Sequence, residues 1–280
     1  MPSDSPDDLP LWILPLGAVV VALVVWSGWW RPAQLAAGPK RPNTLEPWDL
    51  LVAVGLMMAG GLVTGVLAQR MASGAEPASL TTMAYAGWVV LGQVLAQGSG
   101  VAYFLWRAAG EWKALGVWPR RWGRETGLAG VTLVVALPVV FSAMTVAMCV
   151  SQRLGLPVPE TGHQLLTVLR EADSWMGVVL LLGSAVVVAP VLEELLYRGL
   201  LQSVLLWQLG VERRVWVIVG ASVLFALMHA ASVPWQALPG LFVLSLALGW
   251  LYERTGSLWP CVAAHAGFNA VNVGLVLVAG

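Results

Sequence analysis

Charged residues are scarce in this sequence. Only 11% of the 280 residues are Asp, Glu, Lys or Arg, 58% are hydrophobic, and the mean hydropathy is +0.77. Soluble globular domains carry about 25% charged residues, so the composition excludes an ordinary soluble domain. The formal net charge is zero. A polyanionic partner such as nucleic acid is therefore not expected.

Cysteine is also rare. Cys149 and Cys261 both lie inside long apolar runs, and neither belongs to a CxxC motif. They cannot form a disulfide framework, and we expect both to be small core residues. The sequence also lacks an HExxH zinc motif, a low-complexity tail and a clear internal repeat.

What the sequence has instead is a series of long apolar runs. A helix needs about 20 such residues to cross a hydrocarbon core of roughly 30 Å. The runs predict an all-α, polytopic membrane helix bundle with about eight transmembrane helices, in a cell membrane such as the bacterial plasma membrane. The leader MPSDSPDD is acidic, unlike the start of a signal peptide, so we expect the first run to remain as a span. The predicted spans are Leu11–Trp30, Leu50–Gln69, Leu80–Trp106, Gly127–Val150, Met176–Leu209, Val215–Ala231, Trp235–Leu251 and Leu258–Ala279.

The connecting loops predict the orientation. The loops after spans one, three, five and seven hold eleven Lys and Arg residues, and the loops on the opposite side hold three. Because basic loops stay on the cytoplasmic side, both termini should lie outside. The Trp and Arg residues of the loop RAAGEWKALGVWPRRWGRE fit a membrane interface better than a nucleic-acid surface.

Ionisable residues inside the predicted spans are confined to the last hundred residues. They lie in spans five, six and eight: Glu193, Glu194, Arg198, His229 and His265. A charge at the bilayer centre costs about 2.5 to 3.5 kcal/mol, so such groups persist by pairing or by performing a function. We therefore divide the chain into N-terminal spans and loops (1–175) and a candidate catalytic core (176–280).

Helix geometry indicates which of these groups can act together. Glu194 and Arg198 are four residues apart and can pair, while Glu193 is rotated from Glu194 by about 100° and points elsewhere. The same spacing relates Phe225 to His229 and His265 to Asn269. Each of the three helices thus presents one polar stripe, and we expect the stripes to meet inside the membrane. Span five is too long for an upright crossing, which predicts a kink near Pro190 or a projection beyond the bilayer.

These three motifs resemble those of a known family. The order EExxxR, FxxxH and HxxxN is similar to that of the CAAX protease and bacteriocin-processing family of intramembrane endopeptidases, which includes the Ras-converting-enzyme type. Glu193, Glu194 and Arg198 match the first motif, and Tyr197 occupies its aromatic position. The second and third motifs are matched by the Phe225/His229 and His265/Asn269 pairs. The resemblance covers roughly residues 176–279, and it implies about eight helices around a cavity that holds these groups.

The chemistry of peptide hydrolysis suggests a role for each group. Glu193 would deprotonate the attacking water, and His229 would orient that water and assist proton transfer to the leaving amine. His265 and Asn269 would stabilise the oxyanion. Arg198 would hold Glu194 and shape the site. The substrate would be a membrane-associated or lipidated protein or peptide.

Alternatives remain at several points. The Glu194–Arg198 pair could serve packing alone. His229, His265 and Glu193 could instead hold a catalytic Zn²⁺, as a metalloprotease description of the family implies, although the residues favour a glutamic protease that needs no cofactor. A proton-coupled transporter or a catalytically silent scaffold would also place ionisable groups in a bundle.

The basic-loop asymmetry generates a test of topology. In a background without native cysteines, single cysteines at Ser3 and Arg121 should react with an impermeant thiol reagent from opposite sides of the membrane. Labelling of both from the same side would contradict the eight-span orientation.

Overall fold

The computed structural model describes residues 10–29, 31, 35, 38, 43–72, 82–119, 121–157 and 172–279. Every regular element in these ranges is helical, which confirms the all-α prediction. Part of the basic-loop count, including Lys40, Arg41, Arg120 and Arg170, lies outside the described residues.

The first half of the chain forms six described α-helices and the second half forms six more. They are α1 (Ile13–Ser27), α3 (Pro47–Ala72), α4 (Thr82–Leu95), α5 (Gln97–Arg107), α6 (Trp112–Leu115), α7 (Trp122–Arg153), α9 (Trp175–Gly183), α10 (Ala189–Glu194), α11 (Ser203–Leu209), α12 (Arg214–Met228), α13 (Leu238–Thr255) and α14 (Trp259–Ala279). Two π-helical segments, Ser184–Val188 and Leu195–Gln202, join α9, α10 and α11 into one long helical path. Short 3₁₀ turns at Val211–Arg213 and Trp235–Ala237 precede α12 and α13.

Five segments of the described chain are long and apolar enough to cross a membrane. They are Pro47–Leu67, Met83–Arg107, Trp122–Arg153, Trp175–Leu209 and Trp235–Thr255. These correspond to predicted spans two, three, four, five and seven. The helices at the other three predicted spans are α1 and α12, with 15 residues each, and α14, with 21. The membrane-helix bundle is thus confirmed, while the count of eight stays a prediction.

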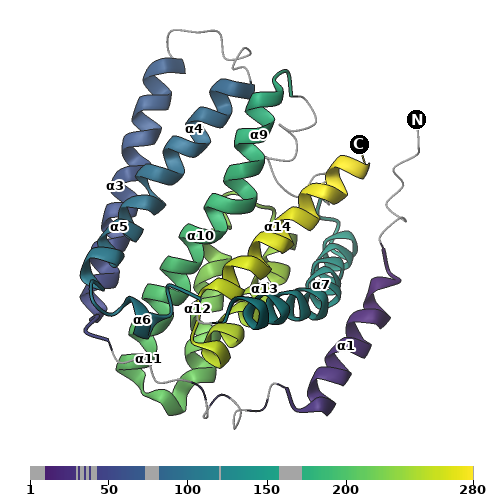
Figure 1. The fold of residues 1–280 in the computed structure, drawn as a ribbon. Helices are drawn as coiled ribbons and strands as arrows, with labels where there is room; N and C mark the ends of the chain where they lie inside the picture. Colours follow the sequence, from purple (N-terminus) through teal and green to yellow (C-terminus); the bar gives the residue numbers. More distant parts are fainter. Residues whose placement is uncertain are drawn as a thin grey trace.

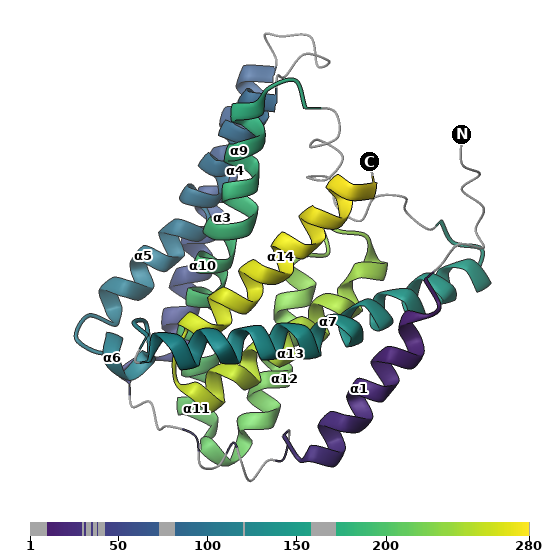
Figure 2. The same ribbon diagram turned by 45° about the vertical axis from the view of Figure 1, so that its right-hand side comes forward.

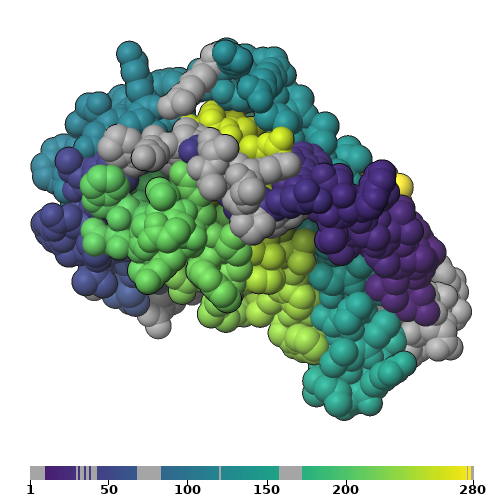
Figure 3. All heavy atoms as spheres, turned by 90° about the horizontal axis from the view of Figure 1, so that it is seen from below, coloured from purple at the N-terminus to yellow at the C-terminus, as the bar shows by residue number. Residues whose placement is uncertain are grey.

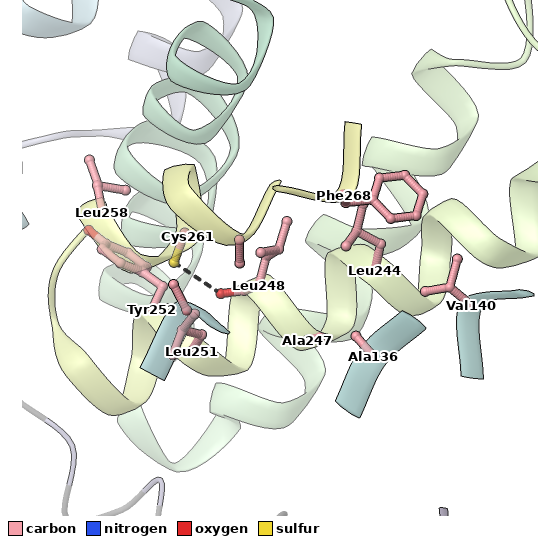
Figure 4. Packing of buried hydrophobic residues seen from close by; sticks show 12 residues of the cluster. Ala136, Val140, Leu244, Ala247, Leu248, Leu251, Tyr252, Leu258, Cys261 and Phe268 are labelled. Atoms are coloured by element: carbon pink, nitrogen blue, oxygen red, sulfur yellow. Dashed lines mark hydrogen bonds between the residues drawn. The ribbon is translucent and has the colours of Figure 1, made fainter. Parts of the chain in front are cut away.

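The bundle is arranged around the central helices α7, α13 and α14 (Figure 1). In both ribbon views α3, α4 and α9 stand beside one another at one end, and α1 packs along α7 at the other (Figures 1 and 2). The main core joins Val140 of α7, Leu244 and Leu248 of α13, and Phe268 of α14 (Figure 4). Cys261 lies in this core with its thiol 3.4 Å from the Leu248 carbonyl oxygen, in agreement with its prediction as a core residue, whereas Cys149 is only partly buried.

Buried ionic contacts also occur outside the predicted set. Asp49 is fully buried and pairs with Arg107, whose Nε lies 2.9 Å from Oδ1. Asp49 lies in the first turn of α3 and Arg107 is the last residue of α5, so each lies one residue outside predicted span two or three. Fully buried Glu253 accepts a 2.7 Å hydrogen bond from Gln202 and lies 3.4 Å from Arg214. It follows the predicted end of span seven by two residues.

Close helix packing generates a prediction at two neighbouring glycines of α3. A Cβ at Gly60 would overlap the Leu95 carbonyl at the end of α4, whereas a Cβ at Gly61 would have no atom within 4 Å. Gly60→Ala should therefore destabilise the protein by about 1 to 3 kcal/mol through forced separation of the two helices. Thermal unfolding in detergent measures this loss. Gly61→Ala is the matched control, and equal melting of the two variants would contradict the packing.

Candidate active site

The long helix that carries both glutamates is irregular on either side of them. The Ala189 N–H donates to the Ser184 carbonyl, five residues back, in the π-helical register. Pro190 follows and has no N–H to offer the Ala185 carbonyl. That carbonyl accepts instead from the side-chain amide of Asn269 on α14, at 2.8 Å. The irregularity expected near Pro190 thus takes the form of a π-helical segment that is closed by a side chain from another helix.

Glu194 and Arg198 form the pair that their spacing predicts. Arg198 Nη1 donates to Glu194 Oε1 at 2.9 Å, and both side chains are almost fully buried. Arg198 Nη2 also donates to the Ser245 carbonyl and hydroxyl on α13, at 3.1 and 2.8 Å. The guanidinium carbon lies 5.2 Å from the centre of the Phe225 ring. One buried arginine thus connects three helices.

Glu194 also orients His265. The Nδ1 atom of His265 lies 2.8 Å from Glu194 Oε1. Because this carboxylate oxygen already accepts from Arg198, the natural arrangement has His265 donating an Nδ1 proton to it. The lone pair of the neutral ring is then on Nε2.

His229 is held in a similar manner by the backbone. It follows the last residue of α12, and its Nδ1 lies 2.7 Å from the Phe225 carbonyl oxygen. A carbonyl only accepts, so Nδ1 carries the proton and Nε2 of the neutral ring carries a lone pair. The ring of Phe225 packs against that of His229 at 4.6 Å between centres.

Both histidines point toward Glu193. Its Oε2 lies 3.8 Å from Nε2 of His229 and 3.8 Å from Nε2 of His265. These separations are too long for direct hydrogen bonds, but a single water could bridge them. Glu193 forms no contact with Arg198 among the interactions of the described chain, in keeping with its predicted rotation away from Glu194.

The four groups line one cavity of about 410 Å³. Glu193, His229, His265 and Asn269 all contribute to its wall, so the structure brings the three predicted stripes together. Glu194 and Arg198 lie behind this wall. Asn269 has a second amide proton besides the one that bonds Ala185, so an oxyanion role remains open to it.

Sequence reasoning missed the contribution of the first half of the chain to this cavity. Tyr85 and Gln93 of α4, Gln97 of α5 and Met144 of α7 also line it. The Ser184 hydroxyl donates to Gln93 Oε1. Two glutamines within the otherwise apolar run 80–106 could have indicated this contribution. Residues on both sides of the predicted boundary at residue 175 therefore line the cavity.

The donor atoms at Glu193, His229 and His265 are spaced more widely than the ligand atoms of a zinc site. Tetrahedral zinc with bonds of about 2.0 to 2.1 Å places neighbouring ligand atoms about 3.3 Å apart, whereas both Nε2 atoms lie 3.8 Å from Glu193 Oε2. Within the described ranges, no group of three or more His, Cys, Asp or Glu is spaced to hold a metal ion. The donor types suit zinc, but the side chains as positioned do not fit it.

Comparison with known families supports the motif assignment. Residues 174–271 match the Rce1-like family, described as type II CAAX prenyl endopeptidase Rce1-like. The match covers about a third of the chain, includes all six predicted site residues, and confirms the resemblance predicted from the three motifs. No curated protein and no solved structure matches the chain.

The ion pair generates a prediction about stability. Arg198→Ala should leave the Glu194 carboxylate buried without its cation and lower the free energy of unfolding by about 3 to 5 kcal/mol. Thermal unfolding in detergent measures this change. Arg213→Ala, at an exposed arginine, is the control and should melt like the wild type. Wild-type melting of Arg198→Ala would contradict the role of the pair.

Proposed function

From the Rce1-like region at residues 174–271, we propose that this protein is an intramembrane endopeptidase that hydrolyses a peptide bond of a membrane-associated or lipidated, CAAX-type protein. The observation that carries the proposal is the placement of Glu193 Oε2 at 3.8 Å from both histidine Nε2 atoms in the wall of a cavity. A carboxylate and two imidazoles around a space for one water form a site suited to hydrolysis.

Glu193 is the proposed general base. The water would donate one hydrogen bond to Glu193 Oε2 and its other to His229 Nε2, which leaves an oxygen lone pair to attack the substrate carbonyl. As the oxygen–carbon bond forms, the water proton passes to Glu193. The same proton then passes to the amine nitrogen as the peptide bond breaks, so the carboxylate returns to its starting state.

His265 and Asn269 are the proposed oxyanion partners. Asn269 can offer its second amide proton while the first stays on Ala185. His265 can donate from Nε2 when both ring nitrogens carry a proton, and its Nδ1 is already held by Glu194 Oε1. Arg198 then fixes Glu194, so it acts on the chemistry through position rather than by touching substrate.

The protease activity generates the central prediction. In liposomes, the protein should cleave a farnesylated CAAX peptide. Glu193→Gln and His229→Ala should each lower kcat by orders of magnitude, and their effects should not add because the two residues act on one water. Asn269→Ala should cost less, about 10²- to 10³-fold, as loss of one oxyanion donor does. Mass spectrometry of the products measures turnover and locates the cleaved bond.

Glu212→Gln is the matched control, because Glu212 is an exposed glutamate outside the cavity. It should retain wild-type turnover. A glutamic mechanism predicts activity after prolonged chelation, whereas loss on chelation and recovery with zinc would show that the same residues hold a metal. Full activity of Glu193→Gln would exclude Glu193 as the general base, and absence of cleavage by the wild type would favour a transporter.

A further inference from the structure

A second cavity lies apart from the candidate active site. It occupies about 360 Å³ between α1, α7 and α13 and shares no lining residue with the first. The residues that line this cavity are mostly apolar and include Val24 of α1, Val139 of α7 and Val243 of α13. Figure 3 shows α1 in purple against the teal α7 and the yellow-green α13. We refer to this cavity as the α1 groove.

The α1 groove lies between helices that are apolar enough to contact lipid. α7 and α13 lie within two of the membrane-spanning segments, and α1 is a shorter apolar helix. Val25 on the α1 wall is 68% exposed, so the groove is open along its α1 edge. From Val21 to the end of α1 at Ser27 the wall runs about 9 Å along the helix, and it continues past the helix end to Trp29. This shape suits one hydrocarbon chain.

A polar group lies within the apolar wall. Thr132 is 6% exposed, and its hydroxyl has no hydrogen-bond partner among the described residues. A hydroxyl in such a position carries an unmet desolvation cost. A ligand that fits the groove should therefore be mainly apolar but should bring an acceptor such as an ester carbonyl.

One end of the groove is cationic. Trp29 and Trp250 line this end, and the Arg254 guanidinium carbon lies 5.8 and 4.9 Å from their ring centres. The Arg31 side chain lies against Gly28 beside Trp29. Arg254 and Arg31 thus lie at the end of an apolar groove. The charge complements an anionic headgroup, and the basic-loop count places this end at the cytoplasmic surface, where anionic lipids concentrate.

We propose that the α1 groove binds an anionic phospholipid. One acyl chain would lie between α1, α7 and α13, an ester carbonyl would accept from the Thr132 hydroxyl, and the phosphate would lie at Arg254. Such a lipid would fill the space between α1 and the central helices. It would join the first helix of the chain to the core without taking part in peptide hydrolysis.

The test compares phosphatidylglycerol with phosphatidylcholine of identical acyl chains, each added to the delipidated, detergent-solubilised full chain and measured by native mass spectrometry. The wild type should bind one phosphatidylglycerol at least fivefold more tightly than phosphatidylcholine, since each arginine near the headgroup contributes about 1 kcal/mol. Arg254→Gln should lower this preference about fivefold. Val139→Phe should fill the groove and weaken binding of both lipids. Thr132→Val should weaken both equally and leave the preference intact.

Arg213→Gln is the matched control, since it removes one exposed arginine outside the groove and should keep the wild-type preference. Equal binding of the two lipids by the wild type, or wild-type binding by both Arg254→Gln and Val139→Phe, would overturn the proposal. Displacement of the lipid by a farnesylated peptide would overturn it as well and assign the groove to substrate. None of these readouts depends on protease activity.

Discussion

The buried contact between Glu194 and Arg198 is the constraint on which the candidate site depends. Burial of a carboxylate and a guanidinium is costly unless each pairs with the other. Here Arg198 bonds Glu194 Oε1 and two oxygen atoms of Ser245, and the same Oε1 accepts from Nδ1 of His265. Glu194 Oε2 is buried and has no hydrogen-bond partner among the described residues. The pair therefore fixes α10, α13 and α14 relative to one another. The direction of the His265 ring follows from this arrangement.

Side chains also satisfy backbone carbonyls of the two π-helical segments. Pro190 removes a donor from the helix, which would leave a carbonyl unpaired inside the membrane. Asn269 supplies the missing donor to Ala185, and the Ser203 hydroxyl donates to the Arg198 carbonyl in the second π-helical segment. Residues that interrupt the regular helix are thus compensated by side chains. One of these side chains also reaches the cavity, so helix geometry and site geometry are coupled at Asn269.

The sequence predicted the local part of this architecture well. The spacing of Glu194 and Arg198 implied a contact that the structure contains, because four residues on a helix fix two side chains on one face. The motifs also identified which helices meet at Glu193. The π-helical register was not predictable, because it depends on Asn269, which lies 84 residues from its partner.

The contacts between residues far apart in the chain could not be predicted from the sequence either. Gln93 and Gln97 could have been assigned to any polar contact, and only the packing of α4 and α5 places them in the wall of the cavity that the histidines also line. Asp49 and Arg107 were missed because predicted span two begins one residue after Asp49 and predicted span three ends one residue before Arg107. A polar residue at the edge of an apolar run gives no sign of whether it faces headgroups or a buried partner. That choice is made by tertiary packing.

Adjacent glutamates allow one helix to serve structure and chemistry at once. Along its contact with α13, Arg198 bonds Ser245, and four residues later Gln202 bonds the Gly249 carbonyl and Glu253. The four-residue steps on both helices place these contacts on successive turns of one polar seam. Glu194 pairs with Arg198 at one end of this seam. Glu193, about 100° around the helix, faces the cavity instead. A carboxylate available to a water and a carboxylate that holds the bundle together can thus be adjacent in sequence, because helix rotation alone separates their roles.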